Sequence, residues 1–82
     1  MTILEEAQKI IAGERREAYG PVEESFLRIA AIWTGILGKP VTPKEVALCM
    51  IGLKTYREAN KAGRDNRIDI VGYAVLADQL EQ

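Results

Sequence analysis

TPKEVALCMIGL, residues 42–53, carries the strongest helix signal in the chain. Thr42 is typical of an N-cap, Pro43 of the first helical position, and Glu45 of the reciprocal partner in a capping box. Residues 46–53 are apolar on every side of such a helix, which is typical of a helix buried all round. We therefore predict a helix over residues 43–59, with residues 46–53 at the centre of the protein.

Three further helices are predicted around this one. Thr2 and Glu5 form a second capping box, and a helical apolar stripe predicts a helix over residues 3–17. Tyr19-Gly20-Pro21 breaks that helix. A second helix over residues 21–37 ends at Gly38-Lys39-Pro40, and an extended connection is expected over residues 39–42. Its inner stripe consists of Val22, Phe26, Ile29, Ala30, Trp33, Ile36 and Leu37.

The last helix is predicted over residues 66–80, with a start near Asp65 or Asn66. The fold class is therefore all-α, a compact bundle of four helices in a single domain over residues 1–82. Three neighbours do not cover a helix that is apolar on every side, so we expect a symmetric homo-oligomer. The alternative is that long side chains such as Arg28 and Lys44 cover the gap.

Composition excludes several classes of protein. A formal net charge of −1 argues against a general binder of duplex nucleic acid, which needs a broadly basic face. No apolar run approaches the ~20 residues of a membrane span, and the acidic N-terminal segment is unlike a secretion signal. One cysteine, Cys49, and no histidine exclude an internal disulfide and argue against zinc. We expect a cytoplasmic protein.

The basic residues concentrate in one stretch, which holds five of the eleven: Lys54, Arg57, Lys61, Arg64 and Arg67. Asp69 and Tyr73 follow one helical turn apart. One interpretation is an internal ion pair between Asp69 and Lys54 or Arg57, with Tyr73 packed over it. The other is a phosphate-binding site, in which Arg64 and Arg67 close over a ligand. Arginine binds a phosphate through two N–H groups of its planar guanidinium. Tyr19 or Tyr73 would then contact the base or ribose.

The carboxylates do not predict a metal site. Glu5-Glu6 and Glu23-Glu24 are adjacent pairs in first helical turns, where the helix dipole already accounts for them. Only Asp69 is placed to point inward, whereas a Mg²⁺ site needs several converging carboxylates. Cys49 has no histidine to activate it. We therefore expect no catalytic residue, no metal and no cofactor.

Two segments, residues 15–59 and residues 65–81, resemble a family of small phage and prophage proteins of unknown function. The resemblance rests on the Tyr19-Gly20 break, the aromatic helix through Phe26 and Trp33, the helix from Thr42 to Arg57, and the segment from Asp69 to Tyr73. The pattern D-I-x-G-Y-A is also distantly similar to the last helix of the MazG-type nucleotide pyrophosphohydrolases. That second resemblance implies a helical oligomer with a nucleotide pocket between helices. Asp69 matches the acidic position on the final helix of that family. Residues 48–57 lack that family's glutamate motif E-E-x-x-E.

These observations favour a phage-type protein that binds and sequesters a phosphorylated nucleotide, such as a host immune signal, without cleaving it. The ligand-binding residues are expected to be Lys54, Arg57, Arg64, Arg67, Asp69, Tyr73 and Tyr19. One alternative is a Mg²⁺-dependent pyrophosphohydrolase with Asp69 as a metal ligand. Another is a protein that binds a phage or host protein through its apolar surface.

Overall fold

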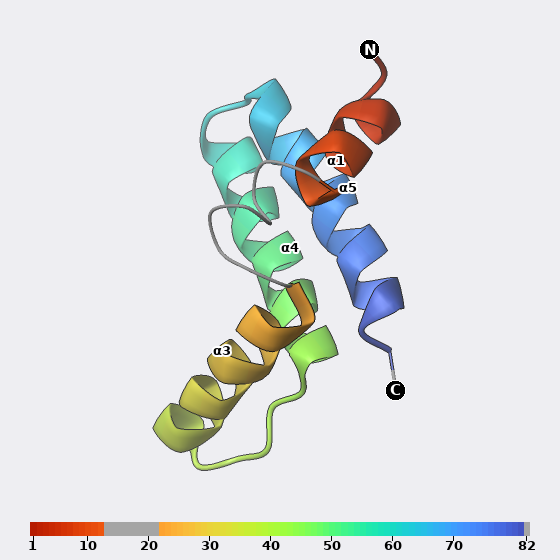
Figure 1. Cartoon of the computed structure of the whole chain (residues 1–82). Coiled ribbons are helices and arrows are strands. Elements are labelled where there is room, and N and C mark those ends of the chain that lie inside the picture. Colours follow the sequence, from red (N-terminus) through yellow and green to blue (C-terminus); the bar gives the residue numbers. More distant parts are fainter. Residues whose placement is uncertain (13–21, 82) are drawn as a thin grey trace.

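The computed structural model describes residues 1–12 and 22–81, and these residues fold as helices without a strand. The helices are α1 (Ile3–Ala12), α3 (Val22–Leu37), α4 (Pro43–Asn60) and α5 (Arg64–Gln79) (Figure 1). The all-α class is confirmed, and the bounds of the last three helices agree with the predicted ones to within two residues. The predicted continuation of the first helix over residues 13–17 and the break at residues 19–21 lie outside the described residues.

Capping side chains begin two of the helices as the sequence predicts. In α4 the Glu45 backbone N–H donates to Thr42 Oγ1 at 3.1 Å, and the Thr42 N–H donates to Glu45 Oε1 at 2.9 Å. Thr2 and Glu5 make the same two bonds at the start of α1, at 3.1 and 3.0 Å. Each pair satisfies two backbone donors that a helix start leaves unpaired.

The connection from α3 to α4 is tied back to α3. Gly38 adopts a φ of +69°, a left-handed conformation that glycine reaches without steric cost, and this ends α3. The Val41 N–H then donates to Thr34 Oγ1 at 2.9 Å. Thr42 follows in an extended conformation (φ −92°, ψ 157°), as the sequence predicts.

Helices α4 and α5 lie side by side and make the most extensive contact, while α1 packs on α5 and α3 packs on α4 (Figure 1). Phe26 of α3 also reaches Tyr73 of α5, with ring centroids 6.3 Å apart. The core forms where these helices meet. It consists of Ile11, Phe26, Ala30, Val46, Ala47, Leu76, Ala77 and Leu80.

The prediction that residues 46–53 are buried all round is wrong. Val46 and Ala47 are 1 % and 0 % exposed, but Leu48 and Leu53 are 49 % and 41 % exposed, and Cys49 is exposed as well. Within the described residues, α3 and α5 cover α4 on two sides and leave its remaining side open.

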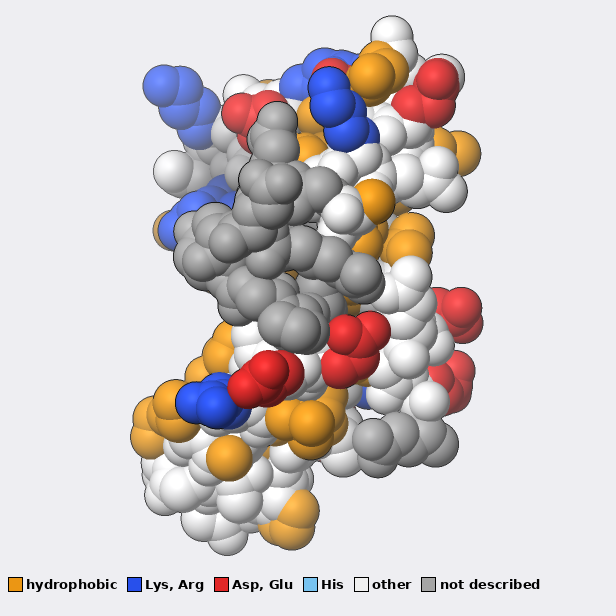
Figure 2. Space-filling view, in the orientation of Figure 1, with side chains coloured by type: hydrophobic (Ala, Val, Ile, Leu, Met, Phe, Trp, Pro, Cys, Tyr) orange, Lys and Arg blue, Asp and Glu red, His pale blue; other side chains and the backbone are white. Residues whose placement is uncertain are grey.

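Helix α3 likewise exposes apolar side chains that were predicted to point inward. Ile36 and Leu37 are 74 % and 63 % exposed, and hydrophobic side chains are visible over α3 in Figure 2. Arg28 and Lys44, proposed as covers, are instead held by Glu24 and Glu81 at 3.0 and 2.9 Å.

None of the helices in the described ranges combines the length and the apolar content that crossing a membrane requires.

Candidate ligand-binding site

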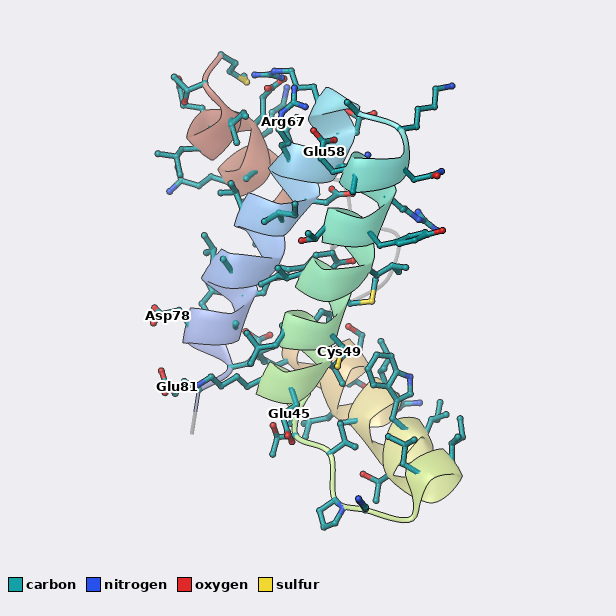
Figure 3. All side chains as sticks on the ribbon, turned by 180° about the vertical axis from the view of Figure 1, so that it is seen from behind. Glu45, Cys49, Glu58, Arg67, Asp78 and Glu81 are labelled. Atoms are coloured by element: carbon teal, nitrogen blue, oxygen red, sulfur yellow. The ribbon has the colours of Figure 1, made fainter. Side chains whose placement is uncertain are left out.

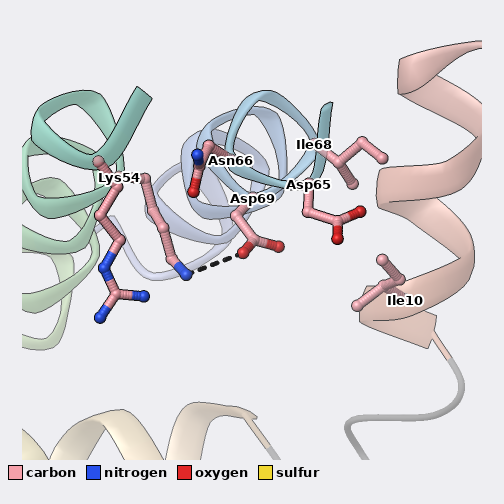
Figure 4. A pocket seen from close by; sticks show the side chains of 7 residues that line it. Ile10, Lys54, Asp65, Asn66, Ile68 and Asp69 are labelled. Atoms are coloured by element: carbon pink, nitrogen blue, oxygen red, sulfur yellow. Dashed lines mark ion pairs between the residues drawn. The ribbon is translucent and has the colours of Figure 1, made fainter. Parts of the chain in front are cut away.

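An open cavity of about 490 Å³ lies where α1, α4 and α5 approach one another (Figure 4). Helix α1 contributes an apolar wall, α4 contributes two cations, and the first turns of α5 contribute carboxylates, an amide and a second apolar side chain. Pockets of 300–1,000 Å³ are typical of small-molecule sites. The described lining consists of Ile10, Lys54, Arg57, Asp65, Asn66, Ile68 and Asp69.

An ion pair crosses the floor of this cavity. Lys54 Nζ of α4 lies 3.0 Å from Asp69 Oδ2 of α5, and the two side chains are only 14 % and 10 % exposed (Figure 4). A lysine ammonium has three donors, so the pair does not exhaust the hydrogen-bonding capacity of Lys54. Loss of the Asp69 carboxylate would leave the nearly buried Lys54 ammonium without this partner, so the pair stabilises the contact between α4 and α5.

Arg57 lies one turn after Lys54 on α4, on the side of the helix that lines the cavity. Four arginines occur in the described residues, and three of them are ion-paired: Arg28 with Glu24, Arg64 with Glu6, and Arg67 with Glu58. Within the same part of the chain, the Arg57 guanidinium makes no ion pair. Arg57 is exposed and borders the cavity, and the five N–H donors of a guanidinium match the geometry of a carboxylate or a phosphate.

The rest of the described lining comes mainly from the start of α5. The Asp65 carboxylate lies between Asp69 and Ile10 in Figure 4, so the two acidic groups are neighbours and the apolar groups follow on the side of α1. Ile68 of α5 is buried at 5 % exposure and, with Ile10 of α1, forms the apolar side. The arrangement offers cations on one side and acceptors with an apolar surface on the other.

Three residues predicted for the site lie elsewhere. Arg64 pairs with Glu6 of α1 and donates to the Met1 carbonyl at 3.2 Å, so it ties the start of α5 to the N-terminus. Arg67 pairs with Glu58 at 2.5 Å. Tyr73 packs against the core beside Phe26. Tyr19 lies outside the described residues.

Glu58 organises the turn between α4 and α5, a role that the charge pattern alone did not reveal. Its Oε1 accepts the Gly63 N–H at 2.8 Å, and its Oε2 accepts from Arg67, which lies beside it in Figure 3. The Gly63 N–H and then the Arg67 guanidinium lower the pKa of the Glu58 carboxyl below its ordinary value. The signal in the sequence is a glutamate in the last turn of a helix followed by a glycine, where an unpaired backbone N–H needs an acceptor.

No set of three or more histidine, cysteine, aspartate or glutamate side chains gathers at a point where it could hold a metal ion, as far as residues 1–12 and 22–81 are concerned. Asp65 and Asp69 are the carboxylates that the described cavity lining provides, and Asp69 is engaged by Lys54.

Comparison with known proteins identifies the family of this chain. The sequence profile of a family described as a domain of unknown function, DUF6378, matches residues 2–81. The Gene 55 protein of Mycobacterium phage L5 is 39 % identical over 83 residues, which cover 99 % of this chain and 53 % of the relative. The Gene 55 protein of Mycobacterium phage D29 is 39 % identical over 80 residues, which cover 96 % of this chain and 53 % of that relative. The chain thus spans about half the length of these relatives. No solved structure matches the chain.

Proposed function

Because the chain belongs to the DUF6378 family, whose function is unknown, we propose a function from the chemistry of the chain's own residues. The protein binds a phosphorylated nucleotide without cleaving it. Its curated relatives include phage proteins. One observation carries the proposal. Arg57, alone among the described arginines, has no ion-pair partner in the described structure, and it borders a cavity of ligand size beside the cation Lys54.

The cavity offers a complementary group for each part of a nucleotide. A phosphate bound by the Arg57 guanidinium would also accept a hydrogen bond from the Lys54 ammonium. Hydrogen bonds between charged groups are stronger than those between neutral groups. The Asp65 carboxylate is an acceptor for ribose hydroxyls or for an exocyclic amino group. Ile10 and Ile68 supply apolar surface for the base.

We further propose that binding is sequestration, in which a phage protein removes a signalling nucleotide made by the host's immune system. Two observations support this part. Curated relatives are phage proteins. The described cavity lining supplies only two carboxylates, and the nearly buried ion pair already engages one of them.

The main alternative is a Mg²⁺-dependent nucleotide pyrophosphohydrolase of the MazG type, with Asp69 as a metal ligand. Its chemistry requires carboxylates that hold Mg²⁺ and position a nucleophilic water. Asp65 and Asp69 both border the cavity, which is the observation in favour of this alternative. The resemblance to that family stays a prediction. A protein-binding role through the exposed apolar surface of α3 and α4 is the third candidate.

A nucleotide panel separates the three functions. The protein is mixed with nucleoside mono-, di- and triphosphates and with cyclic mono- and dinucleotides, each with and without Mg²⁺. Thermal shift reports binding, and the ligand is recovered after denaturation and examined by chromatography. Intact ligand returned in stoichiometric amount is the expected result. Turnover that depends on Mg²⁺ would identify the hydrolase, and a panel without any thermal shift would favour the protein-binding role.

An internal control sharpens this experiment. Lys61→Ala removes an exposed cation from the same basic stretch, but Lys61 is not part of the described cavity lining. This variant is expected to bind like the natural chain, whereas Arg57→Ala is expected to lose the thermal shift. Equal losses in both variants would mean that the cations attract the ligand by overall charge and that the cavity is not the site.

A further inference from the structure

Asp65 is the carboxylate of the described cavity lining that the packing of the helices does not use. Asp69, the other one, is only 10 % exposed and pairs with Lys54 at 3.0 Å. Asp65 is exposed, and within the described residues its carboxylate takes part in no hydrogen bond or ion pair. The helix dipole favours an acidic residue in this first turn of α5, but it does not require that residue to line a cavity. Both oxygens of Asp65 are therefore available as acceptors for a ligand.

The surroundings of Asp65 combine these acceptors with apolar surface. In Figure 4 the Asp65 carboxylate points toward α1 and lies between Ile68 and Ile10. Ile68 is 5 % exposed and Ile10 is half-buried, so both are held in place by the packing of α1 on α5. Aliphatic side chains of this kind can pack against the flat face of a base. A base packed there would present its edge to Asp65.

The polar groups along the cavity follow the order of the parts of a nucleotide. Lys54 and Arg57 lie on α4, and Asp69 of α5 follows across the ion pair with Lys54. Asp65 lies one helical turn before Asp69, on the side away from Lys54 (Figure 4). A nucleotide whose phosphate binds the α4 cations therefore places its sugar over the ion pair and its base beside Asp65.

We propose that the base is guanine and that Asp65 selects it, an inference that rests on the proposed nucleotide-binding function. A carboxylate has two neighbouring acceptor oxygens and no donor. The Watson–Crick edge of guanine offers two neighbouring donors, N1–H and the 2-amino group, so each oxygen accepts one hydrogen bond. Adenine and cytosine place the lone pair of a ring nitrogen beside their amino group, and this lone pair repels the second oxygen. Such repulsion against the wrong partner is a general source of specificity.

Calorimetry with matched nucleotides tests the selection. The probes are GMP, AMP, IMP, which keeps N1–H but lacks the 2-amino group, and dGMP, which lacks the 2′-hydroxyl. Each base is also offered as its 3′,5′-cyclic monophosphate, so the comparison is made in the phosphate form that binds more tightly. The guanine nucleotide is expected to bind at least about tenfold more tightly than the adenine one, the scale of a lost hydrogen bond to a charged group. The hypoxanthine nucleotide is expected to be intermediate, and dGMP is expected to bind like GMP.

One substitution is expected to reverse the preference. Asp65→Asn replaces one acceptor by a donor, and the resulting amide matches the donor and acceptor on the edge of adenine. The affinity for the guanine nucleotide is expected to fall at least about tenfold, below the affinity for the adenine nucleotide. Asp78→Asn is the matched control, because Asp78 is an exposed carboxylate of the same helix outside the described cavity lining. It is expected to leave both affinities unchanged, and thermal melting confirms that both variants are folded.

Failure of the guanine assignment can be told apart from failure of the site. Equal affinities for the three bases, with binding still lost in Arg57→Ala, would leave a nucleotide site and overturn the selection of guanine. Equal affinities for the bases with weak binding of dGMP would assign Asp65 to the ribose instead. A guanine preference that persists in Asp65→Asn would remove Asp65 as the selecting residue. No binding of any of these nucleotides in either phosphate form would overturn the nucleotide site, and the inference with it.

Discussion

Lys54 and Arg57 lie one turn apart on α4, yet their surroundings give them different roles. Lys54 is nearly buried and paired with Asp69, so its charge belongs to the packing of α4 on α5. Arg57 is exposed and has no ion-pair partner in the described structure, so its charge is available to a ligand. A sequence pattern shows the spacing of two such cations but not the burial that separates their roles.

Asp69→Ala is expected to lower the free energy of unfolding by about 3 kcal/mol or more, because it leaves the Lys54 ammonium nearly buried without its partner. Urea denaturation followed by circular dichroism measures the change. Replacing both residues by apolar ones of similar size, Lys54→Met with Asp69→Leu, is expected to recover part of the loss. A loss below ~1 kcal/mol for Asp69→Ala, the size typical of a surface pair, would show that the ion pair does not stabilise the fold.

Arg57→Ala is expected to behave in the opposite way. The free energy of unfolding is expected to change by less than ~1 kcal/mol, as for most surface charges. Nucleotide binding is expected to weaken by ~1.5–3 kcal/mol, the scale of a lost hydrogen bond to a charged group. Isothermal titration calorimetry on a variant shown to be folded measures this, with Lys61→Ala as the matched control. A folded Arg57→Ala protein with unchanged affinity would remove Arg57 from the site.

At the scale of the helices, the turn between α4 and α5 depends on one carboxylate. Glu58 accepts hydrogen bonds from the Gly63 N–H and from Arg67, and both interactions favour its ionised form. Its pKa is therefore lower in the folded chain than in the unfolded one. A depressed folded pKa contributes stability above the unfolded value, and this contribution disappears as pH falls through the folded value.

The stability of the natural chain is accordingly expected to fall below pH 4.5, the ordinary value for glutamate, as Glu58 becomes protonated. Glu58→Gln keeps the shape of the side chain but cannot ionise. Its stability is expected to be lower than that of the natural chain at pH 7 and to depend less on pH between 5 and 3. Thermal melting of both chains across this range tests the point. Parallel pH profiles for the two chains would contradict the role of Glu58.

The helix starts offer a test that needs no ligand. Thr42→Ala removes the side-chain acceptor for the Glu45 N–H, and half of the capping box is lost with it. The free energy of unfolding is expected to fall by ~1 kcal/mol, the usual effect of an N-cap substitution. Urea denaturation measures it, and Thr42→Ser serves as a control because serine keeps the hydroxyl. Equal losses in both variants would assign the effect to the methyl group instead of the cap.

The sequence predicts the helices well because their determinants are local. These determinants act within one or two helical turns, so they can be recognised in the sequence. They include the N-cap Thr42, the proline at position 43 and the left-handed Gly38. Burial is set by neighbours that are distant in sequence. Leu48 and Leu53 read as core residues, but no described helix covers that side of α4.

The same distinction explains the candidate site. Lys54, Arg57 and Asp69 could be assigned from spacing because α4 and α5 are joined by a short turn. The pairing of Arg64 with Glu6 could not be predicted in this way. Glu6 lies 58 residues away in the sequence and reaches Arg64 only through the packing of α1 on α5. Ile10 and Ile68 border the cavity because three helices meet there, and no local pattern in the chain reveals that meeting.

At the scale of the whole molecule, the proposed ligand site and the exposed apolar side chains of α3 lie on different helices. The cavity lies among α1, α4 and α5, whereas Ile36 and Leu37 lie on α3, which packs mainly on α4 (Figure 1). Substitutions on that exposed surface are therefore expected to leave the cavity lining in place. Ile36→Ser is expected to bind nucleotide as the natural chain does, which calorimetry on the folded variant would measure. Loss of binding in this variant would mean that α3 contributes to the site.

The most direct test of the cavity as a nucleotide site is amide NMR during titration with the nucleotide that gives the largest thermal shift. The largest changes in chemical shift are predicted at Ile10 of α1, at Lys54 and Arg57 of α4, and at Asp65 and Asn66 of α5. These residues are far apart in the sequence, and only a ligand in the cavity touches all three helices. Saturable changes confined to that set are the predicted result. Changes centred on α3, or none at all at millimolar nucleotide, would contradict a nucleotide site in this cavity.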